Sequence, residues 1–311
     1  MNFGMEIDKK TPKIAKKFGY TPIKGLDKNR PYVLLAKKDN KYYVIKTSHL
    51  EDEAEILKIL GSDNFFTNKH IIIPKIYQHD KAYIVEDYIG GREIDIKDYD
   101  FDNLIKIVVE RLLSIETSFN RFSNIKKFTK GWNDQYSQKG FKNSEWLRRR
   151  INRWFSDDMS NKVYRFTEKE TGEINNLFGK IKGKNIVTFG AFSPAHIRIS
   201  RHKLGIFDFG RHIRWAPKHY DRAYLWWGLL YDRDLKESSP KFWENLAIRL
   251  SLNIPKNEQA YYWACIIERL AGLAKDLTQS NRAKNLHWKK AIIKIKEEMT
   301  IFAINELIAK I

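Results

Sequence analysis

Apolar and polar positions near the start of the chain follow the pattern of short strands. The stretch 31–47 (PYVLLAKKDNKYYVIKT) holds two β-rich runs around an Asp-Asn pair, which is a hairpin signal. Two more apolar runs, at 70–78 and 81–89, precede the break at Gly90-Gly91. The pattern therefore predicts a small sheet that ends at this break.

Helical spacing interrupts the sheet once and dominates the chain after it. The segment 48–60 begins with a serine suited to N-capping, crowds acidic residues into its first turn and repeats apolar residues at helical steps. The same steps recur from Asp102 onward, and two long helical stretches are expected at 257–277 and 281–310. The exception is 186–209, where short apolar runs predict strands.

This division predicts an α+β protein of two lobes. With 311 residues, 42% hydrophobic and 14% aromatic content, the chain can bury a large core. We expect residues 1–89 to form a small lobe, made of a sheet and one helix, and 90–311 to form a larger, mainly helical lobe. The aromatic side chains of the last two helices are expected to pack in the core rather than to line a binding site.

Composition limits the cellular compartment and the kinds of binding partner that we expect. Cys265 is the only cysteine, which excludes an internal disulfide and a thiolate zinc site and fits a reducing compartment. No apolar run is long enough for a membrane span or a secretion signal, so we expect a cytoplasmic protein without membrane contact. The formal charge of +19 favours nucleotides, nucleic acid or acidic metabolites as partners, or else reflects a lysine-rich proteome.

A lysine followed by an acidic helix forms the first candidate site. Lys46 ends the expected strand YYVIK, and the segment 48–60 follows at once. Such a lysine can hold nucleotide phosphates if a helix carboxylate orients it, and Glu53 and Glu55 are both spaced to do so. The alternative is a solvated lysine beside a solvated helix.

An aspartate after an apolar strand forms the second candidate site. In LGIFDFG (204–210), Asp208 stands at the end of the strand and just before Phe-Gly. A carboxylate held there by a strand and a turn suits a Mg²⁺ ion that bridges phosphate oxygens. The alternative is an ordinary turn aspartate.

The order of these motifs resembles the aminoglycoside phosphotransferase family of the protein-kinase-like fold. The matching stretches are VIKTS (44–48), LEDEAEIL (50–57) with Glu53, AYIVEDYIGG (82–91), FGAFSPAHIRI (189–199), IFDFG (206–210) and PKHYDRAYL (217–225). In the last of these, the family has an aspartate that packs beneath the active site. The likeness spans residues 30–225 and implies a bilobal fold that binds ATP and Mg²⁺.

The resemblance implies a role for each matching residue. Lys46 would contact the nucleotide phosphates and pair with Glu53, and Asp208 would ligate magnesium. The adenine would be held by backbone groups around Glu86, Asp87 and Tyr88.

His196 stands where the family usually has a metal-binding asparagine, and macrolide phosphotransferases are similar to this chain in having histidine there. An imidazole nitrogen can replace an amide oxygen as a ligand, although Mg²⁺ prefers oxygen. His196 therefore contacts metal or phosphate in one interpretation, and is a hydrogen-bonded structural histidine in the other.

Ala191 is the main departure from the family pattern. The family loop opens with His-Gly-Asp, whose aspartate accepts the proton of the substrate hydroxyl, whereas this chain reads Phe189-Gly190-Ala191. A methyl group cannot accept a proton, so a general-base contribution of roughly 10² to 10⁴ in rate is absent unless another group supplies it. The alanine is either an engineered substitution or a natural change, and Phe189 favours the latter because one designed mutation would not explain both.

Basic and aromatic residues alternate in 130–155. The segment could follow a phosphate backbone through Arg148, Arg149 and Arg150 while its aromatic rings stack with bases. We favour the alternative, an amphipathic helix with apolar residues inward and solvated arginines. Because the family forms its acceptor pocket here, the basic charge predicts an anionic or neutral small-molecule acceptor rather than a polycationic aminoglycoside.

Three functions remain open at this stage. The leading hypothesis is an ATP- and Mg²⁺-binding protein, by descent a small-molecule phosphotransferase, impaired at Ala191. The second is a catalytically inactive pseudokinase scaffold whose basic C-terminal lobe binds nucleic acid or an acidic protein. The third, nucleotide transfer in the same site, needs a proton acceptor that the sequence does not reveal.

Overall fold

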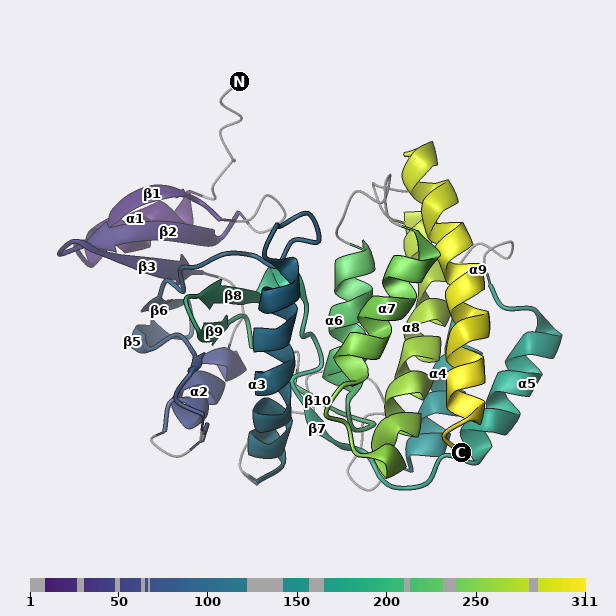
Figure 1. Ribbon diagram of the computed structural model, residues 1–311. Coiled ribbons are helices and arrows are strands. Elements are labelled where there is room, and N and C mark those ends of the chain that lie inside the picture. The colour runs from purple at the N-terminus through teal and green to yellow at the C-terminus, as the bar shows by residue number, and fades with distance from the viewer. Residues whose placement is uncertain are drawn as a thin grey trace. The chain divides into compact units, whose positions relative to one another are not determined.

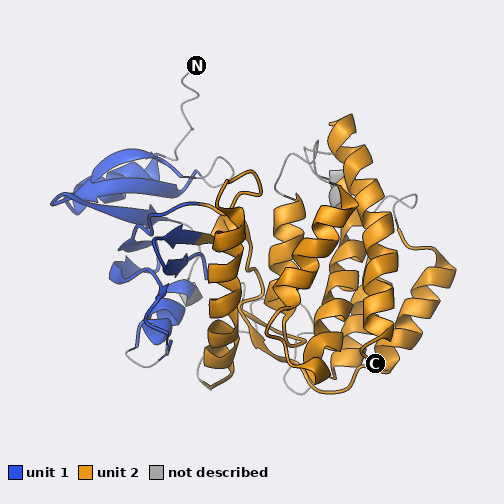
Figure 2. Cartoon of the chain, in the orientation of Figure 1, with its two compact units in different colours: residues 1–92, 198–211 blue, residues 93–197, 212–311 orange. Residues whose placement is uncertain are grey.

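The chain divides into two compact units in this computed structural model (Figure 2). One unit comprises residues 1–92 and 198–211, and the other comprises 93–197 and 212–311. The structure describes residues 9–26, 31–47, 51–62, 65–66, 68–121, 142–156, 165–209, 213–231, 239–279 and 285–311.

A five-stranded antiparallel sheet forms the centre of the smaller unit (Figure 1). Its strands lie in the order β1, β2, β3, β6, β5. The strands span Thr21–Gly25 (β1), Val33–Lys38 (β2), Lys41–Lys46 (β3), Ile76–Asp80 (β5) and Tyr83–Asp87 (β6). The predicted hairpin is confirmed, because β2 pairs with β3 across Asp39 and Asn40, whose φ angles of 48° and 60° suit a tight turn.

Two helices belong to the smaller unit, α1 (Lys10–Lys17) and α2 (Glu51–Leu60). The predicted helix is present as α2, whereas α1 is a second helix that the apolar pattern did not predict. The helix has only eight residues, four of which are lysine, so its apolar stripe is confined to Ile14, Ala15 and the adjoining Phe18. Ala15 nevertheless joins the core of the sheet, whose other buried members are Tyr20, Leu34, Ala36, Tyr43, Ile45 and Val85.

A second sheet, of three strands, brings a distant hairpin into the smaller unit. Strand β4 (Ile71–Ile72) pairs in parallel with β9 (Lys203–Ile206), which also neighbours β8 (Ile197–Ser200). Gly91 has a φ of +133°, and a Cβ atom there would lie 2.8 Å from the carbonyl oxygen of Ile199, so a side chain does not fit. Asp208, which follows β9, thus belongs to the smaller unit; the lobe boundary expected at residue 90 stays a prediction.

The larger unit is mainly helical (Figure 1). Its helices are α3 (Phe101–Arg121), α4 (Asn143–Ser156), α5 (Glu168–Gly179), α6 (Tyr220–Tyr231), α7 (Pro240–Ser251), α8 (Gln259–Gln279) and α9 (Leu286–Ile308). A short antiparallel pair, β7 (Ile186–Thr188) with β10 (Arg214–Ala216), completes the unit together with the 3₁₀ turns η3 (Pro194–His196) and η4 (Lys256–Glu258). Helix α8 packs against α4, α6 and α9. The two predicted tail helices are present as α8 and α9.

Large aromatic side chains fill the core of the larger unit. Trp226, Trp243, Tyr262 and Trp263 are at most 1% exposed. The indole N–H of Trp226 donates to the carbonyl of Trp243, and the hydroxyl of Tyr262 donates to the carbonyl of Ala247. The burial of Tyr262 and Trp263 confirms their expected packing role.

Helix α4 contains the described part of the basic and aromatic segment, and residues 130–141 lie outside the described residues. Trp146, Leu147 and Ile151 are buried, which confirms the interpretation as an amphipathic helix. The expectation of solvated arginines is wrong for Arg150, which is 4% exposed.

Arg150 is buried because it neutralises an interior carboxylate. Its Nε donates to Oε1 of Glu268 over 2.8 Å, and the indole N–H of Trp154 donates to the same oxygen. Arg269 donates to both oxygens of Glu268. Burial alone would raise the pKa of Glu268, but the two guanidinium groups lower it to about 2, so the carboxylate stays ionised.

Among the helices that the structure describes, none combines the length and the apolar character needed to cross a bilayer.

Arg150→Ala should lower the free energy of unfolding by about 3 kcal/mol, because it removes one cation from a buried ion pair. Arg148→Ala is the matched control: Arg148 is exposed on the same helix, and its loss should change the free energy by less than about 0.5 kcal/mol. Urea unfolding of both variants measures the difference. Equal effects would contradict the structural role of Arg150.

Candidate functional site

Lys46 lies at the centre of a buried charge cluster in the smaller unit. It is the last residue of β3, and its Nζ is 2.7 Å from Oε1 of Glu53 and 2.7 Å from Oε1 of Glu86. Glu53 comes from α2, whereas Glu55 on the same helix is exposed. The structure thus selects Glu53 as the helix carboxylate and adds Glu86, whose side chain the sequence did not link to Lys46.

Burial and charge act in opposite directions on this lysine. Lys46 is 6% exposed, Glu86 2% and Glu53 0%. Burial by itself would lower the pKa of Lys46, but the charges of Glu53, Glu86 and Asp208 raise it well above its ordinary value. The amine is therefore a permanent cation at neutral pH.

Two carboxylates cannot both be fully compensated by one amine. Burial raises the pKa of Glu86 to about 7; the charge of Lys46 opposes this effect, whereas the charges of Glu53 and Asp208 reinforce it. The second oxygen of each carboxylate, Oε2 of Glu53 and Oε2 of Glu86, is buried without a hydrogen-bond partner. The cluster thus carries excess negative charge that a proton or a cation can neutralise.

Asp208 belongs to the same unit as Lys46. It follows β9, is half-buried, and adopts a φ of +62°, a left-handed conformation that is uncommon for residues other than glycine. Its charge acts on both Lys46 and Glu86. A strand and a strained turn therefore hold this carboxylate beside the lysine, although the two residues are far apart in the sequence.

The segment expected to hold adenine has already used two of its backbone donors. The N–H of Asp87 donates to the carbonyl of Lys75, and the N–H of Tyr88 donates to the carbonyl of Tyr42. The carboxylate of Asp87 also accepts a hydrogen bond from Tyr77, which raises the pKa of that phenol to about 12. A purine at Asp87 and Tyr88 would have to use their carbonyl groups, and the role of this segment stays a prediction.

Ala191 lies in a buried loop of the larger unit, between β7 and η3. Phe189, Ala191 and Phe192 are at most 1% exposed, and the two phenylalanine rings meet edge to face. Gly190 has a φ of +78°, which glycine adopts without strain. Aromatic packing therefore surrounds the position where the resembling family carries its proton acceptor.

The carboxylate of Asp221 holds this loop from the start of α6. Its Oδ2 accepts from the N–H of Phe189 over 3.0 Å, and its Oδ1 accepts from the N–H of Gly190 over 2.7 Å. This is the aspartate of the segment PKHYDRAYL, and it contacts the loop backbone. Burial raises its pKa to about 7, helped by the charge of Glu116 and opposed by the two backbone hydrogen bonds.

His196 closes the other end of the loop. Its Nδ1 is 2.7 Å from the carbonyl oxygen of Ala191 and 3.3 Å from Oγ of Ser193. Because a carbonyl can only accept, Nδ1 must carry the hydrogen and donate it. In the neutral ring the lone pair is then on Nε2, the nitrogen through which a metal could be bound. The structural hydrogen bond and the ligand role are thus compatible.

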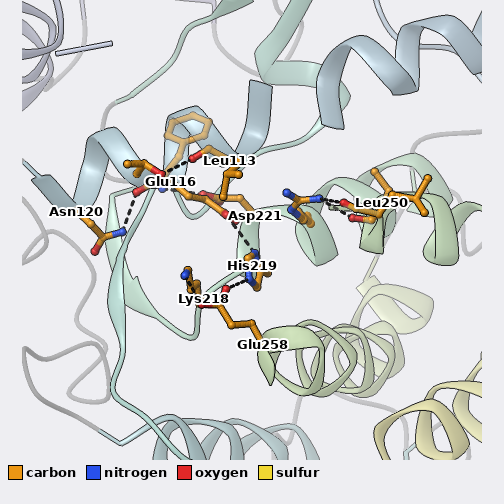
Figure 3. A network of polar contacts seen from close by, with 12 residues as sticks. Leu113, Glu116, Asn120, Lys218, His219, Asp221, Leu250 and Glu258 are labelled. Carbon is orange, nitrogen blue, oxygen red and sulfur yellow. Dashed lines mark hydrogen bonds and ion pairs between the residues drawn. The ribbon is translucent and has the colours of Figure 1, made fainter. Parts of the chain in front are cut away.

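A network of ionisable side chains lies beside Asp221 (Figure 3). His219 is fully buried, with Nδ1 3.1 Å from Oε2 of Glu116 and Nε2 2.9 Å from Oε2 of Glu258. Lys218 donates to Oε1 of Glu258 over 2.6 Å. Each ring nitrogen of this imidazole therefore faces a carboxylate oxygen. No signal in the sequence pointed to this network, because Glu116 and His219 are 103 positions apart.

The described residues meet some of the requirements of a site for a nucleotide and its cation. The excess negative charge around Lys46 suits a cation, and the carboxylate of Asp208 is a hard oxygen ligand of the kind that Mg²⁺ prefers. Across the described part of the chain, no cluster of three or more His, Cys, Asp or Glu side chains could hold a metal ion alone. A cation here would therefore keep water or phosphate oxygens as ligands.

Replacing Asp221 should change how stability depends on pH. Because its pKa is raised from 3.8 to about 7 in the folded protein, its contribution to stability is fully present below about pH 4 and declines as the pH rises through 7. Asp221→Asn removes this titration. The difference in free energy of unfolding between the wild type and this variant should fall by roughly 2 to 4 kcal/mol between pH 4 and pH 7.

Denaturant titrations at several pH values measure this difference. Asp221→Ala serves as the second variant: it leaves the N–H groups of Phe189 and Gly190 without their partner and should cost more than Asp221→Asn at pH 7. A difference between wild type and Asp221→Asn that does not change with pH would show that Asp221 does not titrate in this range.

Comparison with known proteins finds likeness in structure alone. No protein-family model and no curated protein matches the sequence. A solved structure of the amicoumacin kinase hAmiN in complex with AMP-PNP, Ca²⁺ and Ami has a TM-score of 0.56 at 10% identity, over 94% of this chain and 94% of that chain.

Two further solved structures are similar to this chain. The aminoglycoside phosphotransferase APH(2'')-Ib with ADP bound has a TM-score of 0.55 at 11% identity, over 94% of this chain and 99% of that one. The ethanolamine kinase Pv091845 of Plasmodium vivax has a TM-score of 0.55 at 13% identity, over 92% of this chain and 84% of that one. The chain therefore has the protein-kinase-like fold of aminoglycoside phosphotransferases and related small-molecule kinases, which confirms the predicted fold class.

Proposed function

We propose that this protein binds ATP with Mg²⁺ and descends from small-molecule phosphotransferases, with transfer to a hydroxyl group impaired at Ala191. The observation that carries the proposal is the buried ion pair between Lys46 and Glu53, with the charge of Asp208 acting on the same amine. Kinase-fold proteins use a lysine oriented in this way to position nucleotide phosphates. Solved structures with the same fold contain ADP or AMP-PNP.

Lys46 would hold the phosphates through the one N–H that its two carboxylate partners leave, since an ammonium group has three. Asp208 would supply a carboxylate to magnesium. The metal, when bound, supplies charge that offsets the phosphate oxygens. Glu53 keeps the lysine charged and directed, so these residues contribute positioning and charge.

The loop around Ala191 would have a fixed backbone but no side chain at residue 191 that can accept a proton. Asp221 and His196 fix its backbone, but residue 191 carries a methyl group. Positioning and general-base catalysis are separate contributions to the rate, and the latter is roughly 10² to 10⁴. We therefore expect nucleotide binding with slow or undetectable phosphoryl transfer.

The acceptor would be a small molecule with a hydroxyl group and neutral or negative charge, because the chain carries a formal charge of +19. The alternative of a nucleic-acid scaffold is less well supported. Of the three neighbouring arginines in α4, Arg150 is buried against Glu268 and Arg149 pairs with Glu145 over 2.7 Å, which leaves a smaller basic surface for phosphates.

ATP with Mg²⁺ should raise the melting temperature by about 5 °C at a concentration near a hundred times its dissociation constant, because it binds the folded state alone. Lys46→Met should reduce or remove this shift. Lys41→Met is the matched control, since Lys41 is exposed on the same strand. Differential scanning fluorimetry measures the shift. Wild-type protein that shows no shift at millimolar nucleotide would contradict nucleotide binding.

Ala191→Asp should restore a proton acceptor and raise the rate of phosphoryl transfer by about 10² to 10⁴ over the wild type, with one or more acceptors in a panel of hydroxyl metabolites. Ala195→Asp introduces the same carboxylate at an exposed position nearby and should give no gain. Mass spectrometry of the products separates transfer of phosphate from transfer of a nucleotide.

Circular dichroism of the Ala191→Asp variant checks that the buried loop still folds around the larger side chain. A folded variant that binds nucleotide and stays inactive across the panel would count against a lost base as the sole defect.

A further inference from the structure

Glu86 is the side chain of the Lys46 cluster that the proposed function does not use. It lies on β6 beside β3, where Val44 pairs with Glu86 and Lys46 pairs with Ile84. Paired residues of neighbouring strands share a face, so Glu86 and Lys46 are diagonal neighbours on that face. The pairing of two strands inside the sheet therefore fixes the separation of the carboxylate and the amine.

This contact competes with any anionic ligand of Lys46. The amine donates its hydrogens at 2.7 Å to Glu53 and to Glu86, and both carboxylates are buried. A phosphate group that approaches the third hydrogen also approaches two carboxylates that cannot move into water. With both ionised, the surroundings of the lysine are negative before the phosphate arrives, which opposes its binding.

We propose that Glu86 is a positioning residue that makes Lys46 available to a phosphate only when the Glu86 carboxylate is neutral, so that nucleotide binding takes up a proton. The inference rests on the proposed function, because it assigns a regulatory device to the same phosphate site. Glu53 differs from Glu86 in this scheme: it is the helix residue whose hydrogen bond orients the lysine.

The charged groups that act on Glu86 come from three other elements. They are Lys46 of β3, Glu53 of α2 and Asp208 after β9. Burial and the two acidic neighbours favour the neutral form of Glu86, and the lysine favours the ionised form. The balance raises the pKa of Glu86 to about 7, so its charge changes near neutral pH.

The expected pH dependence follows from the fraction of protein with neutral Glu86. At pH 8, about one molecule in eleven would have a protonated Glu86, so the wild type should bind AMP-PNP with Mg²⁺ roughly tenfold more weakly than a variant without this charge. At pH 6 the wild type and the variant should bind almost equally. The nucleotide's own protonation affects both proteins alike and cancels in the comparison.

Glu86→Gln is the test variant, because its amide oxygen can still accept from Lys46 without carrying charge. Isothermal titration calorimetry with AMP-PNP and Mg²⁺ at pH 6, 7 and 8, in two buffers of different ionisation enthalpy, gives affinity and proton uptake together. At pH 8 the wild type should take up close to one proton more per nucleotide than Glu86→Gln, and Glu86→Gln should bind roughly tenfold more tightly.

Two further variants separate this inference from a general charge effect. Glu53→Gln makes the same change at the other carboxylate and should not tighten binding, because loss of the Glu53 charge favours the ionised form of Glu86, which still competes for the lysine. Glu55→Gln makes it at an exposed position of α2 and should leave affinity unchanged. Equal tightening in Glu53→Gln and Glu86→Gln would overturn the specific role of Glu86.

The remaining outcomes distinguish the inference from the proposed function. If the wild type and Glu86→Gln bind nucleotide equally at pH 8 with no difference in proton uptake, the role of Glu86 is wrong and nucleotide binding stands. If neither protein binds nucleotide at any pH, although both remain folded by circular dichroism, the proposed function fails and the inference with it. Binding by Glu86→Gln alone would support both.

Discussion

The amine of Lys46 keeps its charge inside the protein only because carboxylates surround it. Burial opposes the charged form, and Glu53, Glu86 and Asp208 outweigh that cost. These side chains come from α2, from β6 and from the turn after β9. The strand order of the main sheet and the docking of the 198–211 hairpin in the same unit are therefore both conditions for the cluster to exist.

The number of cationic partners decides whether a buried carboxylate in this protein is ionised. Glu268 and Glu86 are both glutamates of the interior, at 0% and 2% exposure. Glu268 faces two guanidinium groups, and its pKa is lowered to about 2, whereas Glu86 shares one amine with Glu53, and its pKa is raised to about 7. The first contact is thus a permanent structural ion pair, and the second can change its charge near neutral pH.

The loop around Ala191 is anchored independently of the side chain at that position. Its shape depends on backbone groups, since Asp221 accepts from two N–H groups and His196 donates to a carbonyl. None of these contacts uses the side chain of residue 191. A substitution at this position would therefore leave these anchoring hydrogen bonds in place.

Much of the fold and part of the site could be predicted from the sequence. The β2–β3 hairpin, the helix α2 and the tail helices follow from spacing within a few residues, and the order of the motifs predicted a kinase-like fold that the solved structures confirm. The ion pair of Lys46 with Glu53 could be predicted because the two residues are only 7 positions apart in the sequence. Helix α1 was missed because it spans only eight lysine-rich residues, although Ile14 and Ala15 lie on its buried face.

Only the tertiary structure showed which charged side chains pair with one another. From its basic segment, Arg150 is expected on the surface, but it is buried because it pairs with Glu268. The two residues are 118 positions apart in the sequence and are brought together only by folding. The same holds for His219 between Glu116 and Glu258, and for Glu86 beside Lys46. By itself the sequence determined local structure, which depends on neighbours along the chain; charge pairing depends on neighbours in space, and only folding brings those together.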